Sequence, residues 1–185
     1  MFKKILTETV EMVEGLKWLE PDVERVSDLI ATAFRNGSKL LICGNGGSAS
    51  DSAHFATEWL CRFEQDRRPF PAIALTSEGG LLTAIGNDYA SDEVFARQVR
   101  GLGLPGDVLV VLTTSGNSPN VIRALAAAKE CGLSSVAMLG RDGGNAKGLA
   151  TIDLIVPVQR TARIQEGHKI LIHAICAMVE ERLVD

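Results

Sequence analysis

The segment LLICGNGGSAS, residues 40–50, passes from an unbroken apolar run into glycines and hydroxyls, and a helical pattern follows it. Four further short apolar runs occur along the chain, separated by longer segments of helical periodicity. Near-continuous apolar runs are typical of parallel strands that are covered on both faces. We therefore predict strands at Leu40–Cys43, Ala72–Leu75, Val108–Leu112, Ser135–Leu139 and Ile152–Val156.

The segments between these runs predict helices on both faces of an open sheet, because parallel strands need right-handed crossovers. Residues 4–35 also have helical periodicity, and Pro21 suits the first turn of a helix, so we expect two helices joined near Glu20. The fold class is α/β, a three-layer αβα sandwich with a five-stranded parallel sheet and an N-terminal helical pair. The other expected helices are Ala49–Phe63, Leu81–Ile85, Asp92–Gly101, Pro119–Cys131, Asn145–Leu149 and Arg163–Leu183.

The composition is that of an ordinary globular protein. The chain has 185 residues, 46% of them hydrophobic, and a net charge of −4, which predicts one domain over residues 1–185. Its apolar runs fall short of the roughly 20 residues that span a bilayer. The four cysteines have no CxxC spacing, and basic residues do not form a stripe, so we expect neither a disulfide framework nor a nucleic-acid partner. A cytoplasmic enzyme or regulator of small molecules, without membrane contact, is the expectation.

The loop after the first predicted strand has the character of a ligand-binding turn. Gly44, Gly46 and Gly47 allow close approach of a ligand to the backbone, and the N–H groups of the following helix favour an anion or a sugar oxygen. Asn45 and Ser48 add polar side chains. The spacing of Gly44, Gly46 and Ala49 also fits a dinucleotide fingerprint, but the second predicted strand ends in Thr76-Ser77 rather than in an acidic residue, so that alternative is weak.

The loop after the third predicted strand, TTSGNSP at residues 113–119, is rich in hydroxyls. Ser118 suits a helix N-cap and Pro119 the first helical position. Four hydroxyl side chains at a helix N-terminus form a neutral cradle for a phosphate monoester. The loop lacks the lysine of a P-loop, so nucleotide triphosphate hydrolysis is not indicated. The phosphate candidates of this loop are Thr113, Thr114, Ser115 and Ser118.

The candidates for acid–base or metal chemistry lie on two helices. His54 and Glu58 are four residues apart and therefore share one helix face. On the last predicted helix, His173 lies about 80° around the axis from Gln165 and about 140° from His168. Spacing does not choose between Gln165 and Glu166 as its neighbour, and a core histidine remains an alternative for His173. Asn87-Asp88 is either a helix C-terminal turn or a ligand contact.

Taken together, these motifs strongly resemble the phosphoheptose isomerases of the sugar isomerase (SIS) superfamily. The resemblance rests on CGNGGS at residues 43–48, HFATE at 54–58, TTSGNS at 113–118, RIQEGH at 163–168 and His173, and it extends over essentially the whole chain. It implies a single SIS domain whose residues 1–36 take part in oligomer contacts. Ala162 stands where some relatives carry an acidic residue, so any role of that carboxylate is absent or supplied elsewhere.

The resemblance also implies an activity and a set of roles. Such enzymes are homotetramers that convert sedoheptulose 7-phosphate to D-glycero-D-manno-heptose 7-phosphate through an enediol(ate), the first step toward the heptose of lipopolysaccharide. Glu58 and His173 would be the acid–base pair, and the tie on the last helix is resolved in favour of Gln165. The implied Zn²⁺ ligands are His54, Glu58, Gln165 and His173. The implied phosphate contacts are Ser48, Thr113, Thr114, Ser115 and Ser118. The implied sugar contacts are Asn45, Gly46, Gly47, Asn87 and Asp88, joined by Glu58 and Gln165.

Two other functions fit the same fold. One relative of the family, the DnaA initiator-associating protein, has much of the same loop pattern but binds a replication protein and does not keep the acid–base pair. A sugar-phosphate sensor is the other alternative. The presence of Glu58 and His173 together with His54 and Gln165 favours an enzyme.

Overall fold

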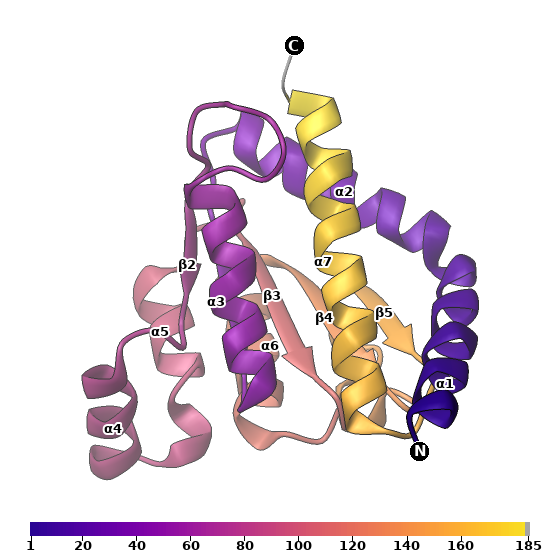
Figure 1. Cartoon of the computed structure of the whole chain (residues 1–185). Helices are drawn as coiled ribbons and strands as arrows, with labels where there is room; N and C mark the ends of the chain where they lie inside the picture. Colours follow the sequence, from indigo (N-terminus) through magenta and orange to yellow (C-terminus); the bar gives the residue numbers. More distant parts are fainter. Residues whose placement is uncertain (184–185) are drawn as a thin grey trace.

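A computed structural model describes residues 1–183 as a parallel sheet between two layers of helices (Figure 1). The sheet has five strands in the order β2-β1-β3-β4-β5, and all its neighbouring strands run parallel. This confirms the αβα prediction. Each predicted strand agrees with the observed one to within one residue at either end: β1 (Leu40–Gly44), β2 (Ala72–Ala74), β3 (Val108–Thr113), β4 (Ser134–Gly140) and β5 (Ile152–Val156).

The helices form one layer on each side of the sheet. One apolar core joins the sheet to α2 (Glu20–Arg35), α3 (Gly47–Leu60) and α7 (Thr161–Leu183), and the start of this layer is α1 (Phe2–Gly15). The second core joins it to α4 (Gly79–Asp88), α5 (Ala96–Leu102) and α6 (Pro119–Glu130). Along β3, Val110 and Leu112 face the first core while Leu109 and Val111 face the second. Both faces of the strand are thus buried, which explains its unbroken apolar sequence.

Two helix predictions need adjustment. The expected helix Asn145–Leu149 is wrong: this part of the chain forms only a short 3₁₀ turn, η3 (Gly144–Ala146), because Gly143, Gly144 and Gly148 take positive φ angles that an α-helix does not accept. The expected helix Asp92–Gly101 is divided into η2 (Ser91–Glu93) and α5. The N-terminal pair is present, with a 3₁₀ turn, η1 (Leu16–Leu19), at the predicted junction.

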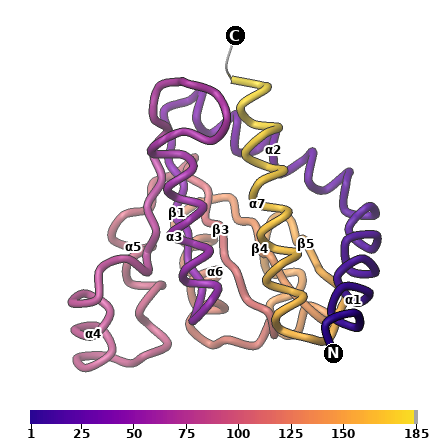
Figure 2. Tube along the Cα trace, viewed as in Figure 1, coloured from indigo at the N-terminus to yellow at the C-terminus, as the bar shows by residue number. Residues whose placement is uncertain are grey.

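The strand order places two loops side by side. β1 lies between β2 and β3, so the direction of the chain across the sheet reverses between β1 and β3, and Gly44 is paired with Leu112 there. Ligands of open α/β sheets bind beyond the carboxyl ends of the strands at such a reversal. The loops that follow β1 and β3 therefore share one end of the sheet. Helices α3 and α7, far apart in sequence, lie next to each other on one face (Figure 2).

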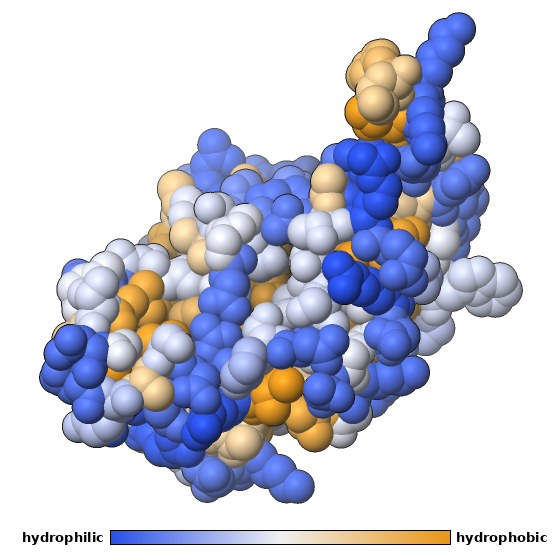
Figure 3. All heavy atoms as spheres, turned by 90° about the horizontal axis from the view of Figure 1, so that it is seen from below, coloured by the Kyte–Doolittle hydropathy of each residue, from blue (hydrophilic) through white to orange (hydrophobic). Residues whose placement is uncertain are grey.

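Several apolar side chains of the N-terminal region remain exposed in the single chain. On α1, Phe2 is 70% and Val10 is 61% exposed, and Trp18 in η1 is 88% exposed. Figure 3 shows one face of the molecule, on which apolar residues gather in separate patches among polar ones. None of the helices within residues 1–183 is long and apolar enough to cross a membrane.

Candidate active site

The two predicted loops form one cavity of about 300 Å³ at the carboxyl end of the sheet. We call this cavity, with its lining residues, the cradle. Every residue of the cradle is uncharged, so an anion held there would meet hydroxyls, amides and backbone N–H groups rather than a cationic side chain. The lining residues are Asn45, Gly46, Gly47, Ser48, Leu112, Thr113, Thr114, Ser115, Ser118, Thr161 and Gln165.

Three helices begin at this cavity. α3 starts at Gly47, α6 at Pro119 and α7 at Thr161, and each start is at or beside a residue of the cradle. A helix N-terminus carries unpaired N–H groups and a partial positive charge. Thr161 was missed in the sequence analysis, although a small hydroxyl residue before an amphipathic segment is a helix-start signal. Three helix starts beside a neutral cavity are an arrangement that favours an anion without a lysine or arginine.

Two positions of the first loop require glycine for steric reasons. Gly46 precedes α3 with φ +55°, a conformation that residues with a side chain rarely adopt. A Cβ atom on Gly47 would lie 2.5 Å from Nε2 of Gln165, so the amide of Gln165 occupies the space directly beside Gly47. The structure therefore places Gln165, rather than Glu166, at the cavity. Glu166 instead forms an ion pair with Arg163.

In the second loop, Ser118 is the N-cap residue of α6, as predicted, but its hydroxyl does not cap the helix. The hydroxyl lies 3.2 Å from Oγ1 of Thr113, and both residues line the cavity. Asn120 links the two loops, since its amide and that of Asn45 exchange two hydrogen bonds of 2.8 and 2.9 Å. A side-chain pair thus joins segments 75 residues apart beside the cradle.

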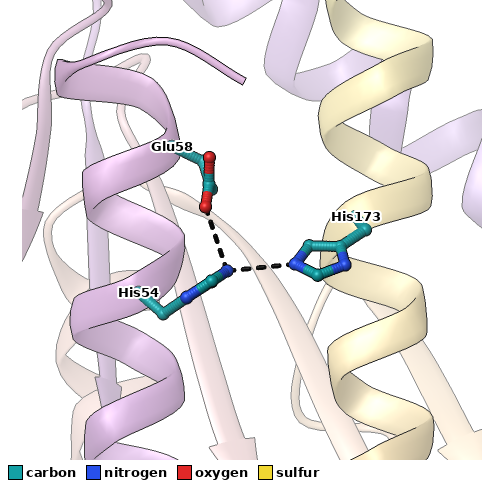
Figure 4. A group of neighbouring side chains, drawn as sticks. All are labelled: His54, Glu58 and His173. Atoms are coloured by element: carbon teal, nitrogen blue, oxygen red, sulfur yellow. Dashed lines mark hydrogen bonds and ion pairs between the residues drawn. The ribbon is translucent and has the colours of Figure 1, made fainter. Parts of the chain in front are cut away.

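A second group of side chains lies between α3 and α7 and consists of His54, Glu58 and His173, which we call the triad (Figure 4). Nε2 of His54 is 3.0 Å from Oε1 of Glu58 and 3.0 Å from Nε2 of His173. The three ligand atoms all lie within 4.8 Å of one another. This geometry shows that the two helices bring the predicted acid–base and metal candidates together across 119 positions of the chain.

The triad fits a divalent cation. One hydrogen on Nε2 of His54 cannot be shared equally with a carboxylate and a second imidazole, whereas a cation placed among them would use the lone pairs of all three atoms. Two imidazole nitrogens and a carboxylate oxygen are a donor set that Zn²⁺ favours. Burial and the charge of Lys169 lower the pKa of His54, and together they outweigh the charge of Glu58, which raises it. The lowered pKa favours the neutral imidazole, which is the form that binds a metal ion.

The other histidine of α7 has a different environment. His168 is completely buried, and its Nε2 lies 3.0 Å from the carbonyl oxygen of Leu139 in β4. Burial lowers the pKa of His168 despite this hydrogen bond. His168, not His173, is therefore the core histidine whose Nε2 pairs with a backbone carbonyl. The helical angle between the two predicted that they would not share a site.

Asn87 and Asp88 are not brought to the cradle within one chain. Both are exposed at the end of α4, where the Asn87 amide donates to the Asp88 carboxylate at 2.8 Å. Asp88 lines a different cavity, between α4 and α5, whose wall includes Tyr89 and Arg97. The turn that the sequence predicted is present, but its side chains lie apart from the other candidates.

Comparison with known proteins identifies the family. Residues 5–140 match the model of the SIS domain. Over 165 residues, which are 89% of this chain and 86% of the relative, the chain is 52% identical to the phosphoheptose isomerase of Geobacter sp. (strain M21). The chain belongs to the phosphoheptose isomerases.

Phosphoheptose isomerases that are less similar in sequence also match over nearly their whole length. The relative from Aquifex aeolicus is 46% identical over 99% of this chain and 96% of its own. The solved structure of the phosphoheptose isomerase from Neisseria gonorrhoeae superposes with a TM-score of 0.91 at 42% identity and covers 97% of each chain. The chain is therefore an isomerase with the SIS fold, as the resemblance in sequence implied.

Proposed function

We propose that this isomerase interconverts sedoheptulose 7-phosphate and D-glycero-D-manno-heptose 7-phosphate through an enediol(ate). The observation that carries the proposal is the pairing of a neutral anion cradle with an adjacent carboxylate–imidazole group, both of which include residues of α3. The helix rises about 9 Å from Ser48 in the cradle to His54 in the triad. An extended sugar phosphate bound by its phosphate in the cradle would present its other end toward the triad.

In this proposal the cradle positions the substrate. The hydroxyls of Ser48, Thr113, Thr114, Ser115 and Ser118 and the three helix starts hold the phosphate, while Asn45, Gly46, Gly47 and Gln165 contact the sugar. Positioning of this kind lowers the barrier by removing the entropy cost of orienting the reacting carbons. Because the phosphate is remote from the reacting end, its contacts supply binding energy and not proton transfer.

The triad moves the protons. Aldose–ketose isomerisation removes a proton from C1 of the ketose, returns one to C2 and shifts a proton between the two oxygens. The carboxylate of Glu58 takes the carbon proton, and the imidazole of His173, which can both donate and accept a proton, serves the oxygens. His54 and Gln165, with Glu58 and His173, would hold Zn²⁺, which when bound stabilises negative charge on the enediolate oxygens.

The proposal extends to the assembly and the setting of the enzyme. Two features support subunit contacts through residues 1–36 in a homotetramer. They are the exposed apolar residues of α1 and η1, and a groove between α7 and the segment from α1 to α2, whose lining includes Val13, Ile170 and Met178. In such an assembly Asn87 and Asp88 would reach the sugar bound in a neighbouring subunit. The enzyme would act in the cytoplasm, at the first step toward the heptose of lipopolysaccharide.

Turnover of purified protein tests the proposal. We expect conversion of sedoheptulose 7-phosphate, loss of the activity with a chelator and its return with Zn²⁺. Glu58→Gln and His173→Gln should lower turnover at least about 100-fold and leave the oligomer, measured by light scattering, unchanged. Wild-type turnover by both variants would reject the assignment of the acid–base pair. Tight binding of DnaA without any isomerase activity would favour the non-catalytic alternative.

A further inference from the structure

The loop between α3 and β2, residues 61–71, has no regular secondary structure, yet it is anchored by one buried carboxylate. Glu180, near the end of α7, is 1% exposed. It accepts hydrogen bonds from the backbone N–H groups of Phe63, Glu64 and Gln65 at 3.0–3.1 Å. Nε of Arg67 donates to the same carboxylate at 2.7 Å. In Figure 1 this loop arches from the end of α3 toward the C-terminal part of α7.

The guanidinium of Arg67 also binds the end of α3. Its Nη2 donates to the carbonyl oxygen of Glu58 at 2.8 Å, and its Nη1 donates to that of Trp59 at 3.1 Å. The last carbonyls of a helix have no partner within the helix and attract cations. Glu58 lies in the last turn of α3, which ends at Leu60, where helices otherwise fray. Arg67 thus holds the backbone of the residue that carries the proposed base.

The same loop also contacts the other half of the acid–base pair. The ring of Phe63 packs against the imidazole of His173, with ring centroids 5.6 Å apart and planes inclined by 33°. The Phe63 backbone N–H is one of the groups bound by Glu180. The anchored loop therefore contacts both residues of the proposed pair. Arg67 binds the carbonyl oxygen of Glu58, and the ring of Phe63 packs against the imidazole of His173.

We propose that the buried Glu180–Arg67 pair is a positioning device that fixes Glu58 and His173 relative to each other. This inference rests on the proposed function, since it assigns no chemistry to the pair itself. The side chains of Arg67 and Glu180 are 3% and 2% exposed. Burial disfavours the ionised carboxylate, but its four hydrogen bonds outweigh that effect and lower the pKa of Glu180, so the pair stays charged.

The opposite end of the sheet offers a matched control. Asp107, whose side chain is 3% exposed, accepts from the backbone N–H groups of Lys39 and Leu104 and from Nζ of Lys39 at 2.6 Å. This is the same kind of anchor, a buried carboxylate with backbone and cationic donors. Lys39 and Asp107 directly precede β1 and β3, however, so they lie at the amino ends of the strands, away from the cradle and the triad.

The test compares Arg67→Lys and Glu180→Gln with Asp107→Asn. Arg67→Lys keeps the buried positive charge but loses the planar fork that reaches two carbonyls and the carboxylate together. We expect kcat to fall at least about tenfold in Arg67→Lys and Glu180→Gln, with the KM for sedoheptulose 7-phosphate changed less than about twofold. Asp107→Asn should be destabilised in denaturant melts and keep kcat within about twofold of the wild-type value.

Hydrogen exchange of the wild-type protein supplies a measurement that does not depend on a variant folding. The amides of Phe63, Glu64 and Gln65 should exchange as slowly as those of α7, although they belong to an irregular loop. Rapid exchange of these amides would overturn the inference. So would wild-type kcat in folded Arg67→Lys, or an equal loss of kcat in Asp107→Asn.

Glu58→Gln separates this inference from the proposed function. If Glu58→Gln is inactive and Arg67→Lys has full kcat, only the positioning role is wrong. If Glu58→Gln itself retains wild-type turnover, the proposed acid–base pair fails and the positioning role fails with it.

Discussion

The cradle and the triad are built in different ways. The cradle is made mainly of two short contiguous segments that follow adjacent strands, whereas the triad joins side chains of α3 and α7 that are up to 119 positions apart. The first uses neutral donors and helix starts, and the second uses a carboxylate and two imidazoles. The difference indicates a division of labour, in which local backbone geometry supplies binding and helix packing supplies chemistry. The first two of the following predictions test that division, and the last two test the roles assigned to residues of α7.

The largest expected effect is on the triad. Glu58→Gln removes the base and should lower kcat by about 10²- to 10⁴-fold, while KM changes less than about threefold, because the phosphate contacts are untouched. His173→Gln should behave alike. Initial rates at varied sedoheptulose 7-phosphate measure both constants. A large rise in KM with an unchanged kcat would place Glu58 in binding and contradict the division.

The cradle should show the converse result. Ser118→Ala removes one hydroxyl donor to a charged group, which is worth about 1.5–3 kcal/mol, so KM should rise roughly 10- to 100-fold with kcat nearly unchanged. Unphosphorylated sedoheptulose is the matched substrate, since its reaction should be insensitive to this variant. If Ser118→Ala impaired the reactions of both sugars equally, the hydroxyl would not serve the phosphate.

A smaller effect separates the two histidines of α7. The pKa of His168 is lowered below 6.5 by burial, so below that pH the unfolded chain binds a proton that the folded chain does not. The neutral, buried His168 therefore costs no stability above about pH 6.5. As the pH falls from there toward the lower pKa of the folded state, the free energy of unfolding decreases, with a slope of at most about 1.4 kcal/mol per pH unit.

Urea melts between pH 5 and 7 measure this slope. His168→Gln can still donate to the Leu139 carbonyl but does not titrate, so it should remove one proton's share of the slope while turnover at neutral pH persists. A steep, unchanged slope in the variant would assign the titration to another group.

The smallest effect distinguishes Gln165 from Glu166. Glu166→Gln weakens a partly exposed ion pair with Arg163, and such pairs contribute at most about 1 kcal/mol, so activity should stay near that of the wild type. Gln165→Ala should reduce activity clearly, because Gln165 lines the cradle. Steady-state rates of the two variants decide the matter, and the reverse order would contradict the placement of Gln165.

The sequence predicted the parts of this molecule that depend on local pattern. All five strands and both loops of the cradle follow from apolar runs, glycines and helix-start residues, since these features act within a few positions. The prediction of a helix at residues 145–149 was wrong because glycines in and beside this segment adopt positive φ angles, which hydrophobic periodicity does not reveal. Thr161 was missed because its role depends on where α7 begins relative to the other two helices.

The parts that depend on packing were not accessible from spacing. Helical angles predicted that His168 and His173 would not share a site. They could not choose between Gln165 and Glu166, because the sequence alone does not show which side of α7 packs against α3. Nothing in the local sequence indicates that Glu180 binds three consecutive backbone N–H groups of the loop after α3. Resemblance to the family favoured Gln165 over Glu166, and the three-dimensional structure shows Gln165 in the lining of the cradle.

Isotope exchange tests the role of Glu58 most directly. The reaction of sedoheptulose 7-phosphate in D₂O, followed by NMR, reports proton transfer at carbon separately from binding. The account predicts deuterium at C2 of the aldose product with the wild-type protein, and no exchange above background with Glu58→Gln under saturating substrate. Exchange at the wild-type rate in Glu58→Gln would show that another group handles the carbon proton and would contradict the account.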